Sequence, residues 1–346
     1  MKKWFMIVML FSFLWIPVRG AELVAPEPPS EVQPLLPQDR DSFGEGLWYV
    51  VRSALGVLRP DLHTLCGVCL SVIGAAMLIS TLQNFEGKSK QAVSICGVVA
   101  VACLLFYSSN SLINLATQTV WQMSQYGKLL LPVMTAALAS QGGVSSSSAL
   151  YVATAGVDAL LTGAISLVLI PCVYLYLAIS LAQCGLEDTM LGKLRDLIRW
   201  CLTWGLKIIL YAFMAYISIT GVITGTADQT AVKAAKLTIS GMVPIVGSIL
   251  SDASETVIIS AGMIKNTAGI YGVLALLAIV AVPFLKIGAH YLLLKLTSAV
   301  CAAFSGRSIC RVLESFSAAM GFLLAITGTV CLILIISIIC FMKGMG

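Results

Sequence analysis

Few side chains in this chain are of a type that performs chemistry. Among them are acidic residues in or beside apolar segments. Asp158 is a single acid between two apolar runs, Leu129–Val157 and Ala159–Leu186. Because a carboxylate is costly to place inside an apolar helix, such acids often serve ion or proton paths. The alternatives are a position near the membrane interface or a structural ion pair, for which Lys207, just before the next apolar run, is a possible partner.

Two further acids, Asp252 and Glu255, are three residues apart, so a helix would place them on one face. They lie beside a serine-rich segment that contains Ser251. This leaves two hypotheses: the acids line a wet cavity, or they lie at the outer surface against a partner or water.

The thiols and imidazoles do not form a metal-binding pattern. Most of the eleven cysteines lie in apolar runs, and Cys66-x-x-Cys69 has no second pair at ligand spacing. His63 and His290 are too few and too scattered to complete such a site, and we expect Lys286 to extend from a helix end toward water. Phosphate-binding loops, serine-hydrolase elbows and zinc-protease motifs are also missing. We therefore expect no cofactor, no metal and no enzymatic activity.

The composition indicates that lipid surrounds most of the chain. The 346 residues are 59% hydrophobic and 11% charged, against about 25% charged residues in a soluble domain. The net charge of +5 is spread over short loops, which does not suggest nucleic-acid binding. The sequence predicts an all-α polytopic membrane protein with about six spans. The predicted spans are Leu62–Phe85, Gln91–Gly127, Ala159–Leu186, Ile208–Ala227, Asn266–Leu285 and Ser315–Met342.

The N-terminal region predicts export of the adjoining segment. Residues 1–20 combine two lysines, an apolar run and small residues before Ala21, as a signal peptide does; the alternative is an uncleaved first helix. Residues 21–61 comprise an acidic, proline-rich linker, expected to be extended and solvated, and an amphipathic helix over 45–59 that suits a membrane surface or a partner. The helical membrane domain is expected over residues 62–346.

An internal duplication is suggested by an offset of 112 residues, which pairs Pro132 with Pro244, Pro171 with Pro283, and two arginines with two others. The repeats would cover residues 92–203 and 204–315. In each, a segment of about twelve residues contains the first proline: Leu129–Ser140, and Ile239–Leu250 with Gly247. At about 18 Å each, these segments are too short to cross the bilayer core.

Such segments either re-enter the membrane without crossing it, which makes the repeats parallel, or cross it, which makes the repeats inverted. Paired broken segments in two repeats are also typical of a transport path. The alternative to a transport role is a helix hairpin packed by small residues. Re-entry fits the basic residues better, because Lys88, Lys193, Arg199 and Arg307 then all lie in the cytoplasm and the acidic linker lies outside.

Several stretches resemble one known family. The run LLPVMTAALASQGG at Leu130–Gly143 is succeeded by SGMVPIVGSILSDASETV at Ser240–Val257 and by VPFLKIGAHYLLLKL at Val282–Leu296. Together they resemble the stage III sporulation protein AE family of endospore-forming bacteria, over about residues 45–342. The second stretch is the more specific, and it contains Pro244, Gly247, Ser251 and Asp252.

The resemblance implies a role that composition does not reveal. Members of this family are made in the mother cell and reside in the membrane surrounding the forespore. There they join other stage III sporulation membrane proteins in a channel or secretion complex. Because the chain has no nucleotide-binding motif, any ATPase would be a separate subunit.

Two functions therefore remain in view. The first is a non-enzymatic subunit of that complex, with the N-terminus of the mature chain outside the cytoplasm. The second is a stand-alone secondary transporter with internal repeats. The candidate transport-path residues for either are Pro132, Asp158, Pro244, Gly247, Ser251, Asp252 and Glu255.

Overall fold

The computed structural model describes residues 26–36, 43–85, 90–140, 144–186, 188–219 and 267–344. Within these ranges every regular element is a helix. The signal-like segment 1–20 and the second proline segment, Ile239–Leu250, lie outside the described residues.

Long apolar helices account for most of the described chain. After the short turn η1 (Gln33–Leu35) the elements are α2 (Phe43–Phe85), α3 (Lys90–Ser140), α4 (Val144–Ala164), the π-helical turn η2 (Ile165–Leu169), α5 (Ile170–Leu186), α6 (Thr189–Ile219), α9 (Thr267–Cys301) and α10 (Arg307–Gly344). Six candidate spans result by length and composition, because α4, η2 and α5 contribute one together. The prediction of an all-α protein with six membrane-spanning helices is thereby confirmed.

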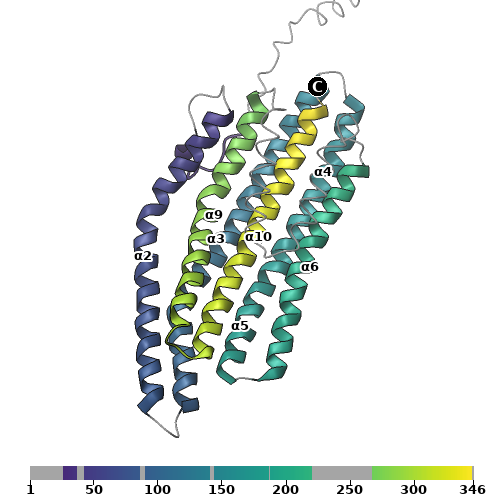
Figure 1. The fold of residues 1–346 in the computed structure, drawn as a ribbon. Coiled ribbons are helices and arrows are strands. Elements are labelled where there is room, and N and C mark those ends of the chain that lie inside the picture. Colours follow the sequence, from purple (N-terminus) through teal and green to yellow (C-terminus); the bar gives the residue numbers. More distant parts are fainter. Residues whose placement is uncertain are drawn as a thin grey trace, which may run out of the picture.

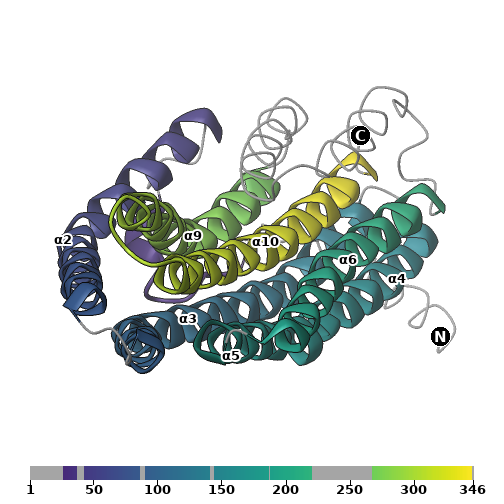
Figure 2. The ribbon, with the colours of Figure 1, turned by 60° about the horizontal axis from the view of Figure 1, so that its bottom comes forward.

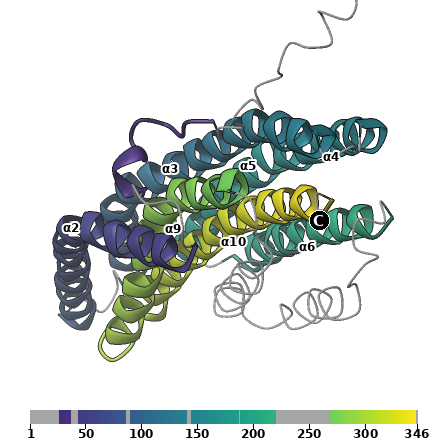
Figure 3. The same cartoon turned by 90° about the horizontal axis from the view of Figure 1, so that it is seen from above.

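The helices form an elongated bundle with α10 at its centre (Figure 1). At one end of the bundle α2, α5 and α9 end and α3, α6 and α10 begin, and α10 finishes at the other end, where α2 begins. Seen from above, α2 and α9 lie toward one edge and α4 and α6 toward the other (Figure 3). The most buried span is Arg307–Ile339. Its Leu- and Ile-rich sequence packs against α3, α5, α6 and α9, so it forms the core.

Glycines allow α3 to approach α10 closely and α9 to approach α3 closely. A Cβ atom on Gly127 would lie 2.8 Å from the Leu334 side chain in α10, and one on Gly272 would lie 2.7 Å from the buried Leu130. Small residues at helix crossings are the usual means of packing helices in membranes. These contacts also fix the relative heights of α3, α9 and α10.

The first proline segment is not a separate element, which corrects the expectation for Leu129–Ser140. These residues form the last turns of α3, and Pro132 lies inside that helix. A proline removes one backbone hydrogen bond, but membrane helices tolerate this when neighbouring groups compensate. Here Leu131 and Met134 are buried in the core, and the Thr135 hydroxyl donates to the Leu131 carbonyl, so packing keeps the helix continuous.

The region before the first span also differs from expectation. The linker is not wholly solvated, because Val32, Leu35 and Leu36 are buried beside η1. The amphipathic segment 45–59 is the first part of α2, which continues through Pro60 into the span. Figure 2 shows α2 changing direction along its length, as expected for a helix with an internal proline.

The internal duplication stays a prediction. The offset of 112 residues places Pro171 at the beginning of α5, directly after η2, and Pro283 inside the uninterrupted α9. The partner of Pro132 is Pro244, which lies outside the described residues.

Candidate functional site

Asp158 is the one predicted site residue that the structure both describes and buries. Its side chain is 6% exposed on α4, and the Ser337 hydroxyl of α10 donates to its Oδ1 atom over 3.2 Å. Its other carboxyl oxygen, Oδ2, is buried without a hydrogen-bond partner. One turn earlier, Thr154 bonds Tyr216 of α6 over 2.9 Å. Asp158 therefore belongs to a polar seam that ties α4 to α10 and α6.

The predicted ion pair between Asp158 and Lys207 is wrong. The Lys207 ammonium lies 5.4 Å from the centre of the Trp204 ring, one turn earlier on α6, where it remains partly exposed. Bringing it to Asp158 would require both charges to lose their water, a cost that attraction does not always offset. Lys207 stacks on an aromatic face in its own helix instead.

An ion pair does join two other helices. The Nζ atom of Lys286 in α9 lies 2.7 Å from Oδ2 of Asp61 in α2, with side-chain exposures of 30% and 43%. The expectation that Lys286 only extends toward water is therefore incomplete, because its ammonium has a specific partner. Both residues come shortly after helix-internal prolines, Pro60 and Pro283. The pair thus connects α2 to α9 just beyond a proline in each helix.

His290 extends this contact to α3. Its Nδ1 atom lies 2.9 Å from the Lys286 carbonyl, and its Nε2 atom lies 3.0 Å from the Ser108 hydroxyl. A carbonyl oxygen can only accept, so Nδ1 carries the proton and, in the neutral ring, Nε2 accepts from Ser108. The result is a polar chain across three helices: Asp61, Lys286, His290 and Ser108.

The register of α9 against α10 places this chain within the apolar zone. Ser317 donates to the Tyr291 carbonyl over 3.3 Å, which puts Lys286 level with Phe322 in α10. Phe322 is eight residues, or about 12 Å, beyond Glu314. The ion pair therefore lies at a height where α10 carries no charged residue.

A third polar group lies between α3 and α5. The Tyr174 hydroxyl of α5 donates to Oδ1 of Asn110 over 3.0 Å and lies 3.5 Å from Oδ1 of Asn114. Both amides belong to the candidate span Ala92–Ala136. Side-chain amides in such helices are usually committed to partner helices or to water.

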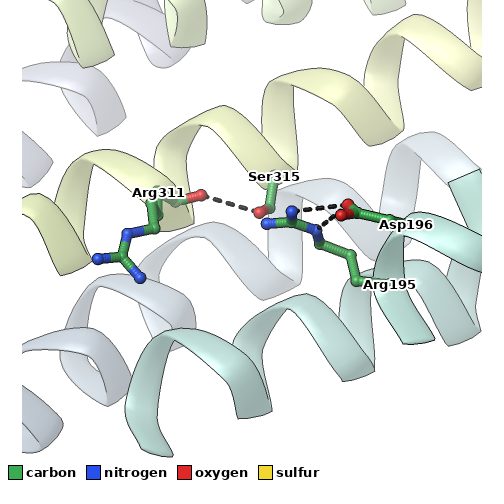
Figure 4. A network of polar contacts seen from close by, with 4 residues as sticks. All are labelled: Arg195, Asp196, Arg311 and Ser315. Carbon is green, nitrogen blue, oxygen red and sulfur yellow. Dashed lines mark hydrogen bonds and ion pairs between the residues drawn. The ribbon is translucent and has the colours of Figure 1, made fainter. Parts of the chain in front are cut away.

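Basic residues concentrate where α6 and α10 begin. Arg195 forms a 2.7 Å ion pair with the adjacent Asp196, and Ser315 donates to the Arg311 carbonyl over 2.8 Å (Figure 4). Figure 4 shows the first turns of the two helices with the Arg311 guanidinium directed away from Arg195. These arginines belong to the end of the bundle that holds the α5–α6 and α9–α10 junctions.

The structure describes two of the predicted transport-path residues, Pro132 and Asp158, and does not bring these two together. Pro132 is exposed on α3 whereas Asp158 is buried, so the two face different surroundings. The remaining five lie outside the described residues: Pro244, Gly247, Ser251, Asp252 and Glu255. Within the described residues no three histidine, cysteine or acidic side chains are close enough to hold a metal ion.

The Asp61–Lys286–His290 chain is not evident from the sequence. Asp61 directly precedes an apolar run and reads as the end of the linker, and Lys286 reads as a helix-end residue. One signal is present: Lys286 and His290 are four residues apart and therefore share a face of α9.

Comparison with known proteins assigns the chain to a family. Residues 42–344 match the family described as stage III sporulation protein AE. The stage III sporulation protein AE of Bacillus subtilis (strain 168) is 27% identical over 283 residues, which cover 79% of this chain and 69% of that protein. No solved structure matches the chain. Since the family match extends over nearly the whole chain, this protein belongs to the stage III sporulation protein AE family.

Proposed function

We propose that this chain is a non-enzymatic, multipass subunit of a channel or secretion complex that joins mother cell and forespore during endospore formation. The observation that carries the proposal is the family match over residues 42–344, which includes all six candidate spans. The relative named above is itself named for stage III of sporulation. A bundle of six apolar helices suits a lipid-embedded subunit of such a complex.

The arrangement of the bundle supports one orientation. The turns near Lys193, Arg199 and Arg307 lie at one end, and the beginning of α2 and the finish of α10 lie at the other. Basic residues favour the cytoplasmic side. The N-terminal linker and the end of α10 would then both lie outside the cytoplasm, in the space between the two membranes. In that position they would be available to other sporulation membrane proteins.

Deletion of the gene in its native spore-forming host tests the proposal. We expect normal vegetative growth, completed engulfment, loss of a late forespore reporter and loss of heat-resistant spores, with recovery on adding the gene back. Chemical cross-linking during sporulation should capture other stage III membrane proteins. Normal sporulation together with a nutrient-uptake defect would contradict the proposal and support a stand-alone transporter.

A further inference from the structure

The outward face of α3 is polar at a depth where a lipid-facing helix is normally apolar. Ser111, Asn114 and Gln118 are exposed, and Gln122 and Gln125 are partly exposed. Successive members are three or four residues apart, so they form one continuous stripe along the helix. We call these five residues the α3 stripe.

The stripe lies within the predicted membrane. Gly127 packs against Leu334, so the heights of Ser111 to Gln125 correspond to residues 318–332 of α10. That part of α10 belongs to the uncharged run Ser315–Met342. From Tyr107, which begins the same face and is 85% exposed, to Gln125 is about 27 Å. The polar face therefore extends over most of a hydrocarbon core of about 30 Å.

The surface at one end of the stripe is hollowed. A groove of about 620 Å³ lies between α3 and α5, with Tyr107 and Asn110 at the stripe. Asn110 is held there by the Tyr174 hydroxyl. Most of its lining is apolar, as at Phe106 and Leu186, so the groove itself is no polar continuation of the stripe.

Contact with lipid hydrocarbon is energetically unfavourable for this polar face. A side-chain amide or hydroxyl in an apolar medium loses the hydrogen bonds that water supplies, at a cost of several kcal/mol without a replacement. The exposed apolar side chains of α4 and η2, such as Leu160 and Leu167, have no such requirement. Uncharged amides and hydroxyls serve water and small polar solutes without selecting strongly for one sign of charge.

We propose that the α3 stripe lines a water-filled path for small polar solutes across the membrane, one wall of which is α3. This inference rests on the proposed function, because the opposite wall comes from a neighbouring subunit of the complex. Pro132 lies on the same exposed face beyond Gln125. The path therefore includes one residue of the set predicted from the sequence and excludes the buried Asp158.

Cysteine accessibility tests the proposal in membranes prepared from sporulating cells, which contain the assembled complex. The native cysteines are first replaced, and single cysteines are placed at Ser111, Asn114 and Gln118. The probe is a cationic, lipid-insoluble methanethiosulfonate. The matched control is Leu292→Cys in α9, which is 65% exposed and lies near the height of Ser111 because Tyr291 is level with Ser317.

We expect modification at the stripe to be at least about tenfold faster than at Leu292, because only the thiolate reacts and hydrocarbon does not permit the thiol to ionise. Equal, slow modification at all four positions would overturn the proposal. If stripe cysteines instead cross-link to a neighbouring chain while resisting the probe, the stripe is a dry helix contact and the proposal is equally wrong.

A functional variant gives an independent readout. Asn114→Leu combined with Gln118→Leu should eliminate heat-resistant spores while the protein remains inserted and cross-linked to its partners. Wild-type spore counts in this variant would overturn the path. The proposed function would survive that outcome if deletion of the gene still blocked sporulation, so the two failures are distinguishable.

Discussion

Asp61 in α2 and Lys286 in α9 form a 2.7 Å ion pair although they are 225 residues apart in the chain. Each lies just beyond a proline within its own helix. His290, one turn after Lys286, carries the contact on to Ser108 of α3. The pair is thus one polar link by which α2, at the edge of the bundle, is attached to the helices that surround α10; the Ser80 hydroxyl, which donates to the Phe304 carbonyl over 2.6 Å, is another.

The ion pair should show measurable coupling. Lys286→Met leaves Asp61 without its partner, and Asp61→Asn leaves the ammonium alone, so each single change should lower the melting temperature of the protein in nanodiscs. The double variant should recover part of the loss, with a coupling free energy of about 1 kcal/mol because both side chains are partly exposed. Lys295→Met on the same helix is the control, since that ammonium lies 5.9 Å from the Tyr291 ring centre. Additive losses would show that the contact contributes nothing.

The Asp158–Ser337 contact makes a second prediction. Ser337→Ala removes the hydroxyl that donates to a buried carboxyl group, which should cost about 1–2 kcal/mol of unfolding free energy. Ser71→Ala provides the comparison, because that hydroxyl bonds only the Gly67 carbonyl in its own exposed turn. We expect the control to change stability by less than about 0.5 kcal/mol. Equal melting temperatures for the two variants would contradict a stabilising role for the seam.

Close helix packing can be tested at glycines. Gly272→Val places a branched side chain against Leu130, which is fully buried. Overpacking of this kind typically costs about 1–3 kcal/mol. A Cβ at Gly74 in α2 would meet nothing within 4 Å, so Gly74→Val should be tolerated. The measurement is the melting temperature, together with the yield of inserted protein; comparable values for both would argue against the crossing of α3 and α9.

The orientation of the bundle is open to labelling in vegetative cells that express the chain with its native cysteines replaced. Gln33→Cys, in the exposed turn η1, should react with a membrane-impermeant maleimide in intact cells. Ala303→Cys, exposed between α9 and α10, should react only after lysis, because the basic end of the bundle is expected in the cytoplasm. The reverse pattern would invert the proposed topology.

The spans were predictable from the sequence because absence of charge over about 20 residues is a local property. The contacts between them were not. Pairing Asp61 with Lys286 requires knowledge of which helices are neighbours, and that depends on packing between distant segments. The same holds for Lys207, which the sequence offers as a partner for Asp158 but which instead stacks on Trp204.

Proline is a misleading signal in this sequence. Pro132 predicts a break, yet the buried side chains on either side of it keep α3 continuous through that point. The polar residues from Ser111 to Gln125, and their helical spacing, can be read from the sequence. That they lie on the outward face of α3 is known only from the packing of its other face against α10. Periodicity alone does not say which side of a membrane helix meets a neighbour.

The most direct test of the central claim is compartment-specific rescue. In a strain deleted for the gene, a copy expressed only in the mother cell should restore the late forespore reporter and heat-resistant spores, whereas a copy expressed only in the forespore should not. A tagged version should be seen in the membrane around the forespore. Rescue from the forespore alone, or full sporulation with neither copy, would contradict the account.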